Sequence, residues 1–184
     1  GIFVGGASRR MGQAKGLLRS PEGPSLIDRT AGLFDAIGVP WVLVGLREEY
    51  APLGYPALAD DVPDTGPLGG LVTLLRHARD GFAIAIACDM PYLSGALLER
   101  LIAAPHGAPI ISARRHHWEP LFARYDAPAV LPLALASAAR GERSLQKLLD
   151  AAAAEALVLA PDEAAQLDDW DTPLDVAAEG RVAR

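Results

Sequence analysis

The chain has 184 residues, of which 51% are hydrophobic and 22% are charged, and these proportions predict one globular domain, over residues 1–184, with a sizeable core. Its net charge of −6 argues against a nucleic-acid partner, which normally requires a basic face. The apolar runs all fall short of the roughly 20 residues that span a bilayer, so we also expect no membrane partner.

The cysteine content excludes folds that depend on disulfides or on several cysteine metal ligands. Cys88 stands alone in the sequence, which rules out an intrachain disulfide and a multi-cysteine metal site. Such a composition fits a reducing compartment, and we expect a cytoplasmic protein.

The first predicted strand, Ile2–Val4, leads into a glycine-rich loop that carries positive charge. Glycines allow a backbone to approach a ligand closely, and successive N–H groups can then cradle an anion. Lysine is rare in this chain, at two of 17 basic residues, and Lys15 is one of the two. We therefore predict a site for a phosphate-rich ligand, against the alternative of an ordinary turn with solvated arginines. The predicted phosphate-binding residues are Val4, Gly5, Gly6, Ala7, Ser8, Arg9, Arg10, Gly12 and Lys15.

Two well-known phosphate motifs do not describe this loop. A Walker A loop has Ser or Thr after its lysine, whereas Gly16 follows Lys15. The dinucleotide fingerprint requires glycines separated by one residue, whereas Gly5 and Gly6 are adjacent.

Further along the chain, a helix over Ser25–Ile37 and a strand over Trp41–Leu46 precede an acidic loop that contains Asp60 and Asp64. For Asp64 we favour helix capping. Glycines then lead into a helix predicted over Leu68–Arg79, and they favour close contact with a ligand. The residues of this second contact are Gly66, Pro67, Leu68, Gly69 and Gly70.

The most apolar strand, Phe82–Cys88, ends at Asp89, and a helix follows over Gly95–Ala103. A carboxylate at the end of a strand, within a phosphate site, is well placed to hold Mg²⁺. The alternative is that Asp89 caps the helix that begins near Ser94. We predict that Asp89 binds the metal and that Cys88 is a buried residue and not a nucleophile.

A strand over Pro109–Ala113 is followed by two arginines and two histidines, Arg114 to His117, and by another strand over Trp118–Tyr125. These four residues either bind a second phosphorylated substrate or form a solvated hairpin tip. Two alanine-rich helices are predicted over Ala127–Ala139 and Ser144–Ala154. Asp171 and Thr172, which precede Pro173, predict a last helix start, and this reading is favoured over a catalytic role for Asp169 or Asp171.

Strands that alternate with helices predict an α/β fold of Rossmann-like architecture. Its sheet would be mainly parallel, with helices on both faces. In such sheets ligands bind outside the carboxyl ends of the strands, so we expect the chemistry in the loops that follow them.

These loops, in this order, resemble those of molybdenum cofactor guanylyltransferases. The pattern G-G-x-S-x-R-M-G-x-x-K over Gly5–Lys15 carries most of the resemblance. It continues through the loop at Asp60, the segment 66–70, Cys88-Asp89-Met90-Pro91, Glu119-Pro120-Leu121 and Asp171-Thr172-Pro173. The sequence departs from the family pattern at Val4, where alanine is usual, and at Asp169 and Asp171, where several members carry asparagine.

The resemblance implies a fold of the nucleotide-diphospho-sugar transferase type and a Mg²⁺-dependent transfer of GMP from GTP to the terminal phosphate of molybdopterin. It implies that the loop from Val4 to Lys15 holds the triphosphate and that Asp60 and residues 66–70 lie near the nucleoside. We assign Lys15 and the Mg²⁺ held by Asp89 to the charge that develops around the α-phosphate, and Arg10 to the leaving pyrophosphate. Proteins that supply molybdopterin or accept the product are expected as transient partners.

Three alternatives stay open on the sequence alone. A related enzyme could use CTP with the same acceptor, or the chain could be a sugar-phosphate nucleotidyltransferase. A nucleotide-binding module without catalysis is the third alternative, and the presence of both Lys15 and Asp89 argues against it.

Overall fold

Apolar side chains that alternate along short strands allow one sheet to bury both of its faces. In this computed structural model Ile2 packs into one core and Phe3 into the other, and Leu43 and Val44 repeat the alternation. The structure describes residues 1–4, 14–19, 23–45, 47–59, 61 and 66–170. The strands are β1 (Ile2–Phe3), β2 (Leu43–Val44), β3 (Ala57–Leu58), β4 (Phe82–Ala87), β5 (Ile110–Arg114), β6 (Trp118–Asp126) and β7 (Glu155–Leu157).

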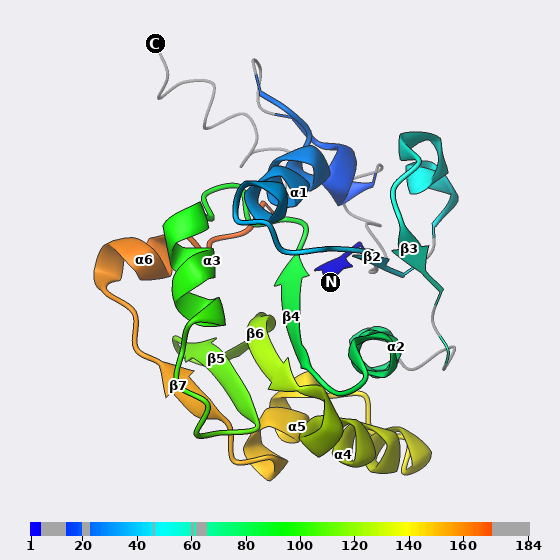
Figure 1. Cartoon of the computed structure of the whole chain (residues 1–184), viewed down its shortest axis with the longest axis vertical. Coiled ribbons are helices and arrows are strands. Elements are labelled where there is room, and N and C mark those ends of the chain that lie inside the picture. The colour runs from blue at the N-terminus through cyan, green and yellow to red at the C-terminus, as the bar shows by residue number, and fades with distance from the viewer. Residues whose placement is uncertain (5–13, 20–22, 46, 60, 62–65, 171–184) are drawn as a thin grey trace.

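Within these residues the strands form one sheet in the order β3-β2-β1-β4-β6-β5-β7 (Figure 1). The pairs β1–β2, β1–β4, β2–β3 and β5–β7 are parallel. Strand β6 is antiparallel to both β4 and β5, and a short hairpin sets its direction relative to β5. The prediction of a mainly parallel sheet is therefore confirmed.

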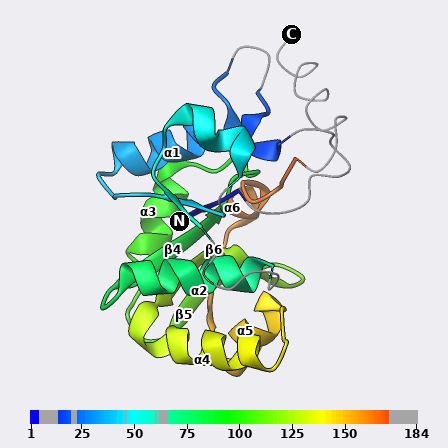
Figure 2. The ribbon, with the colours of Figure 1, turned by 90° about the vertical axis from the view of Figure 1, so that its right-hand side faces the viewer.

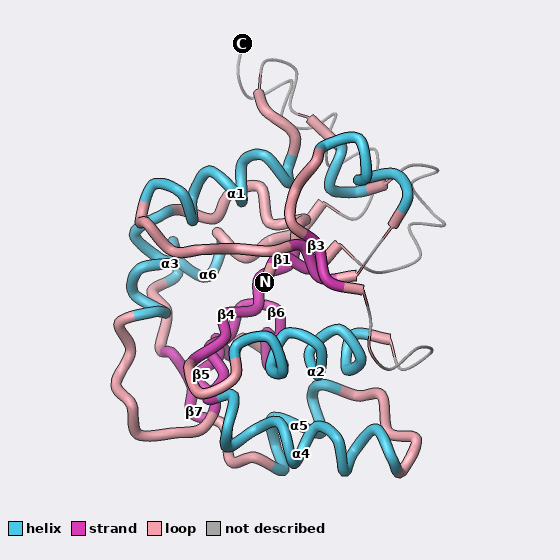
Figure 3. Tube along the Cα trace, turned by 45° about the vertical axis from the view of Figure 1, so that its right-hand side comes forward, coloured by secondary structure: helices cyan, strands magenta, loops and turns pink. Residues whose placement is uncertain are grey.

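Helices cover both faces of this sheet, as predicted (Figures 1 and 3). Helices α1 and α3 contribute to one core, and α2, α4 and α5 contribute to the other. Helix α2 lies along α4, as Figure 2 shows. The helices are α1 (Leu26–Ala36), α2 (Pro67–Ala78), α3 (Gly95–Ile102), α4 (Ala127–Ala139), α5 (Leu145–Ala151) and α6 (Pro161–Ala165), with 3₁₀ turns η1 (Lys15–Leu17) and η2 (Glu48–Leu53). No helix in the described part of the chain is both long and apolar enough to cross a membrane.

Several predicted boundaries were wrong. The strand expected over Trp41–Leu46 is reduced to β2, and the helix expected over Ser144–Ala154 ends at Ala151. Ala153 has a positive φ of 49°, which is incompatible with a continuing helix, and the chain then enters β7. The sequence analysis missed β3, β7 and α6 because each is too short to show a periodic pattern.

Arg124 on β6 is buried, with 2% of its surface exposed. Its guanidinium donates to the backbone carbonyls of Ile102 (2.9 Å), the last residue of α3, and of Ala104 and Pro105 (2.7 Å), which follow α3. The same group lies 4.8 Å from the centre of the Phe82 ring. Arg124 thus attaches the end of α3 to the sheet.

We expect Arg124→Met to lower the free energy of unfolding by about 2–3 kcal/mol, since it leaves buried carbonyls without donors. Urea denaturation followed by circular dichroism measures the effect. Arg140→Met is the control, because Arg140 is exposed and its guanidinium donates to the Ser137 hydroxyl. Equal denaturation midpoints for the two variants would contradict this role.

Candidate active site

The carboxyl ends of β1 and β4 lie side by side near the middle of the sheet. Phe3 pairs with Ala87 in parallel register, and the Cys88 amide donates to the Phe3 carbonyl at 3.2 Å. The loops after Val4 and after Cys88 therefore leave the sheet next to each other. This is the edge where ligands bind in open α/β sheets.

Lys15 and Asp89 meet at this edge. The Lys15 ammonium lies 2.9 Å from Oδ2 of Asp89, although 74 positions separate the two residues. Their side chains are 21% and 19% exposed, so the pair is partly shielded from water and still open to a ligand. Two residues that the sequence predicts to be catalytic are thus in direct contact.

Asp89 also meets the chemical requirement of a metal ligand. Its carboxylate is a hard oxygen donor, and it already holds one cation, the Lys15 ammonium. The described residues contain no group of three or more His, Cys, Asp or Glu side chains arranged around a metal. A Mg²⁺ ion that takes Asp89 from this part of the chain would draw further ligands from substrate phosphates and water.

The alternative interpretation of Asp89, as a helix cap, was wrong. Ser94 is the N-cap of α3, and its hydroxyl accepts from the Leu97 amide at 3.2 Å. Cys88 is buried, as predicted, and burial raises the pKa of its thiol to about 12. A buried thiol that stays protonated near neutral pH is poorly suited to act as a nucleophile, in agreement with the prediction.

The C-terminal part of the chain fixes the backbone of Asp89. The Trp170 amide donates to the Asp89 carbonyl at 3.1 Å, and Trp170 is 1% exposed. Its indole nitrogen lies 3.3 Å from the Tyr92 hydroxyl, on the same loop as Asp89. No local sequence pattern marks these contacts, and the sequence analysis missed them.

Residues 115–117 form the tip of the β5–β6 hairpin, and Arg114 is the last residue of β5. Arg114 stacks on the ring of Trp118, at 4.7 Å from its centre. Arg115 forms ion pairs with Glu119 (2.7 Å) and Asp168 (2.6 Å), and it thereby ties the tip to the segment that carries Trp170. The hairpin is confirmed, and binding of a second phosphorylated substrate by these residues stays a prediction.

Residues 66–70, which the resemblance places near the nucleoside, lie at the start of α2, and Val4 follows β1. Gly66 is the N-cap of α2 with a φ of 61°, a backbone conformation that favours glycine, and Pro67 begins the helix. Leu68 and Val4 bury their side chains in the two cores, so they can offer a ligand only their backbone groups. Gly69 is also buried.

Thr73 connects this helix to the acidic loop. Its buried hydroxyl donates to the Gly69 carbonyl (3.1 Å) and accepts from the Asp61 amide (2.8 Å). The Asp61 carboxylate is in turn 3.1 Å from the guanidinium of Arg76. The lining of a cavity of about 480 Å³ includes Asp61, Thr73 and Arg76.

The other predicted site residues lie outside the described residues, and their roles stay predictions. They are Gly5, Gly6, Ala7, Ser8, Arg9, Arg10, Gly12 and Asp60. The predicted capping residues Asp64, Asp171 and Thr172 also lie outside the described residues.

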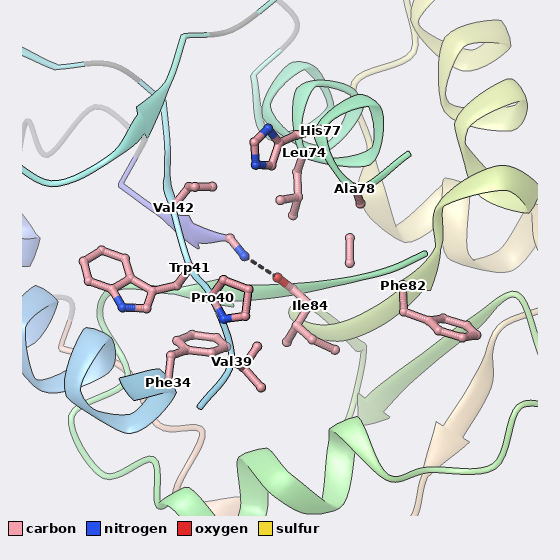
Figure 4. Close-up of a pocket in the computed structure, with 12 residues that line it drawn as sticks. Phe34, Val39, Pro40, Trp41, Val42, Leu74, His77, Ala78, Phe82 and Ile84 are labelled. Atoms are coloured by element: carbon pink, nitrogen blue, oxygen red, sulfur yellow. Dashed lines mark hydrogen bonds between the residues drawn. The ribbon is translucent and has the colours of Figure 1, made fainter. Parts of the chain in front are cut away.

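A separate cavity of about 350 Å³ lies at the opposite edge of the sheet (Figure 4). Its lining includes Phe34, Trp41, His77 and Phe82. Phe82 is the first residue of β4, whereas Asp89 follows the carboxyl end of that strand. This cavity is therefore not part of the Lys15–Asp89 site.

Solved structures of known proteins share this fold. A molybdopterin-guanine dinucleotide biosynthesis protein A from Archaeoglobus fulgidus superposes with a TM-score of 0.81 at 22% identity, over 99% of this chain and 96% of its own. A 2-C-methyl-D-erythritol 4-phosphate cytidylyltransferase from Thermus thermophilus gives a TM-score of 0.68 at 13% identity, over 100% and 98% of the two chains. The fold is that of the nucleotide-diphospho-sugar transferases.

Sequence comparison gives closer relatives. The molybdenum cofactor guanylyltransferase of Xanthomonas euvesicatoria pv. vesicatoria is 34% identical over 94% of this chain and 88% of its own. That of Pseudomonas entomophila is 33% identical over 94% and 92% of the two chains. The family described as the MobA-like NTP transferase domain matches residues 1–172. The chain therefore belongs to the family of MobA-like NTP transferases.

Proposed function

We propose that this chain transfers GMP from GTP to the terminal phosphate of molybdopterin and releases pyrophosphate. The observation that carries the proposal is the contact between Lys15 and Asp89 at the carboxyl edge of β1 and β4. Relatives that are named molybdenum cofactor guanylyltransferase at 33–34% identity support the choice of substrates.

The proposed reaction is an in-line displacement at the α-phosphorus of GTP. The attacking group is a phosphate, which is already an anion, so the protein needs no general base. Catalysis then depends on alignment and on neutralisation of charge. Lys15 stabilises the charge that develops on the α-phosphate, and Arg10 stabilises the leaving pyrophosphate.

Asp89 is the proposed ligand of Mg²⁺, with GTP phosphates and water as the other ligands. When bound, Mg²⁺ supplies further charge neutralisation at the phosphates. The Lys15 ammonium lies against Oδ2 of Asp89 in the structure, so this ammonium and a bound Mg²⁺ would share one carboxylate.

We also propose a cytoplasmic location and transient contacts with proteins that supply molybdopterin or accept the product. The single cysteine, Cys88, supports the location.

Pyrophosphate release tests the proposal. The purified protein is incubated with Mg²⁺, molybdopterin and either GTP, CTP or ATP. Release with GTP alone is the expected result. Release with CTP alone would overturn the choice of base, and a GTP complex that is never consumed would indicate a binding module.

Thr73→Val tests whether the contact between α2 and the acidic loop serves nucleotide binding. We expect KM for GTP to rise about fivefold with little change in kcat, because the substitution removes a positioning contact and not a catalytic group. Steady-state kinetics with varied GTP measures both constants.

Thr30→Val is a matched control. Thr30 is also buried in a helix, and its hydroxyl donates to the Leu26 carbonyl at 2.9 Å, four residues before it. Thr30 lies on α1, away from the acidic loop. If both variants raise KM equally, the effect is one of helix stability and the role of Thr73 is disproved.

A further inference from the structure

The residue after Lys15 packs against a buried tyrosine. Gly16 is buried in η1, and its amide donates to the Tyr50 hydroxyl at 3.2 Å. Tyr50 is 5% exposed and belongs to η2, which follows β2. The two short turns are thus joined by a hydrogen bond across 34 positions of sequence.

The packing at this contact explains why glycine follows Lys15. A Cβ atom on Gly16 would lie 3.1 Å from both Cε1 and the hydroxyl oxygen of Tyr50. Both atoms belong to the buried Tyr50 side chain, which has little room to move. The Ser or Thr that follows the lysine of a Walker A loop would therefore disturb Tyr50.

The hydroxyl acts here as a neutral group. Burial raises the pKa of Tyr50 to about 12, so the phenol stays protonated near neutral pH. Its oxygen accepts from the Gly16 amide, next to the backbone from which the Lys15 side chain extends. This arrangement suits a structural support and not an acid or base.

We propose that Tyr50 is a positioning residue for Lys15. Its hydroxyl and ring fix the turn η1, so that the ammonium of Lys15 reaches Asp89 and, on the proposed function, the α-phosphate of GTP. Tyr50 acts through Lys15 and touches no reacting atom.

Tyr50→Phe tests the proposal through catalysis. We expect kcat for GMP transfer to fall about tenfold, because small displacements of a catalytic group are costly. KM for GTP should change by less than about twofold. In a Lys15→Ala background the same substitution should lower kcat by less than about twofold, since a residue that acts only through Lys15 has nothing left to position.

A second measurement does not depend on the proposed function. The chain has only two lysines, so acetylation by acetic anhydride, quantified by mass spectrometry, compares Lys15 with Lys147 as an internal standard. In Tyr50→Phe, acetylation of Lys15 should rise about threefold while that of Lys147 is unchanged, because a released turn exposes its side chain. This result would support the role of Tyr50 as a positioning residue for Lys15 even if the protein consumed no nucleotide.

Tyr55→Phe is the matched control. The Tyr55 hydroxyl donates to the Asp28 carboxylate at 2.8 Å, so this variant removes a phenolic hydroxyl that does not contact η1. Gly16→Ala disturbs the same contact between Gly16 and Tyr50, so it should also lower kcat and raise acetylation of Lys15. The proposal is overturned if Tyr50→Phe matches wild type in kcat and Lys15 acetylation, or if Tyr55→Phe has the same effects.

Discussion

Lys15→Ala is expected to lower kcat for GMP transfer by about 100-fold or more, the scale on which a lost transition-state donor acts. The ammonium of Lys15 is held 2.9 Å from Asp89, where the charge on the α-phosphate would develop. The loss should appear mainly in kcat, because the charge that Lys15 compensates grows in the transition state. Initial rates of pyrophosphate release at saturating GTP measure it.

Lys147→Ala is the control for this variant. Lys147 is the other lysine of the chain, and its side chain is 72% exposed and paired with Glu142. Its removal should leave kcat within about twofold of wild type, as is usual for an exposed ion pair. If Lys15→Ala keeps turnover within about fivefold of wild type, its catalytic assignment is wrong.

Asp89→Asn is expected to lower kcat by about 100-fold or more and to raise the Mg²⁺ concentration required for half-maximal activity. Asparagine has nearly the same size as aspartate, but it cannot pair with Lys15 as an anion. The backbone contact from Trp170 is retained, so the variant should fold normally. Activity measured over a Mg²⁺ titration reports the loss of metal binding. Urea denaturation checks that the variant is folded.

Asp35→Asn is the control for Asp89→Asn. Asp35 is exposed and accepts a hydrogen bond from the Trp41 indole at 2.8 Å, away from the site. We expect its metal dependence to match that of wild type. Wild-type turnover by Asp89→Asn at ordinary Mg²⁺ concentrations would exclude Asp89 as the metal ligand.

The meeting of Lys15 and Asp89 could be anticipated from the sequence because it follows from topology. Both residues come after predicted strands, and adjacent parallel strands present their carboxyl ends at one edge. The antiparallel direction of β6 relative to β5 could also be anticipated from the sequence, since only a short turn separates Arg114 from Trp118.

The supporting contacts could not be anticipated. Tyr50, Thr73 and Trp170 act through hydrogen bonds to residues that are distant in sequence or on another element. A tyrosine after two glutamates, or a threonine within an apolar helix, looks the same whether or not its hydroxyl has such a partner. Only the three-dimensional packing distinguishes them.

The hydrogen bond from Trp170 to Asp89 also sets an order of events during translation. The ribosome completes β4 and Asp89 well before it reaches Trp170. A nascent chain that stalls in between can contain Lys15 and Asp89 but lacks the donor that fastens the Asp89 backbone. The finished arrangement is therefore available only to a polypeptide that extends through Trp170, and translation products that end before Trp170 should not carry it.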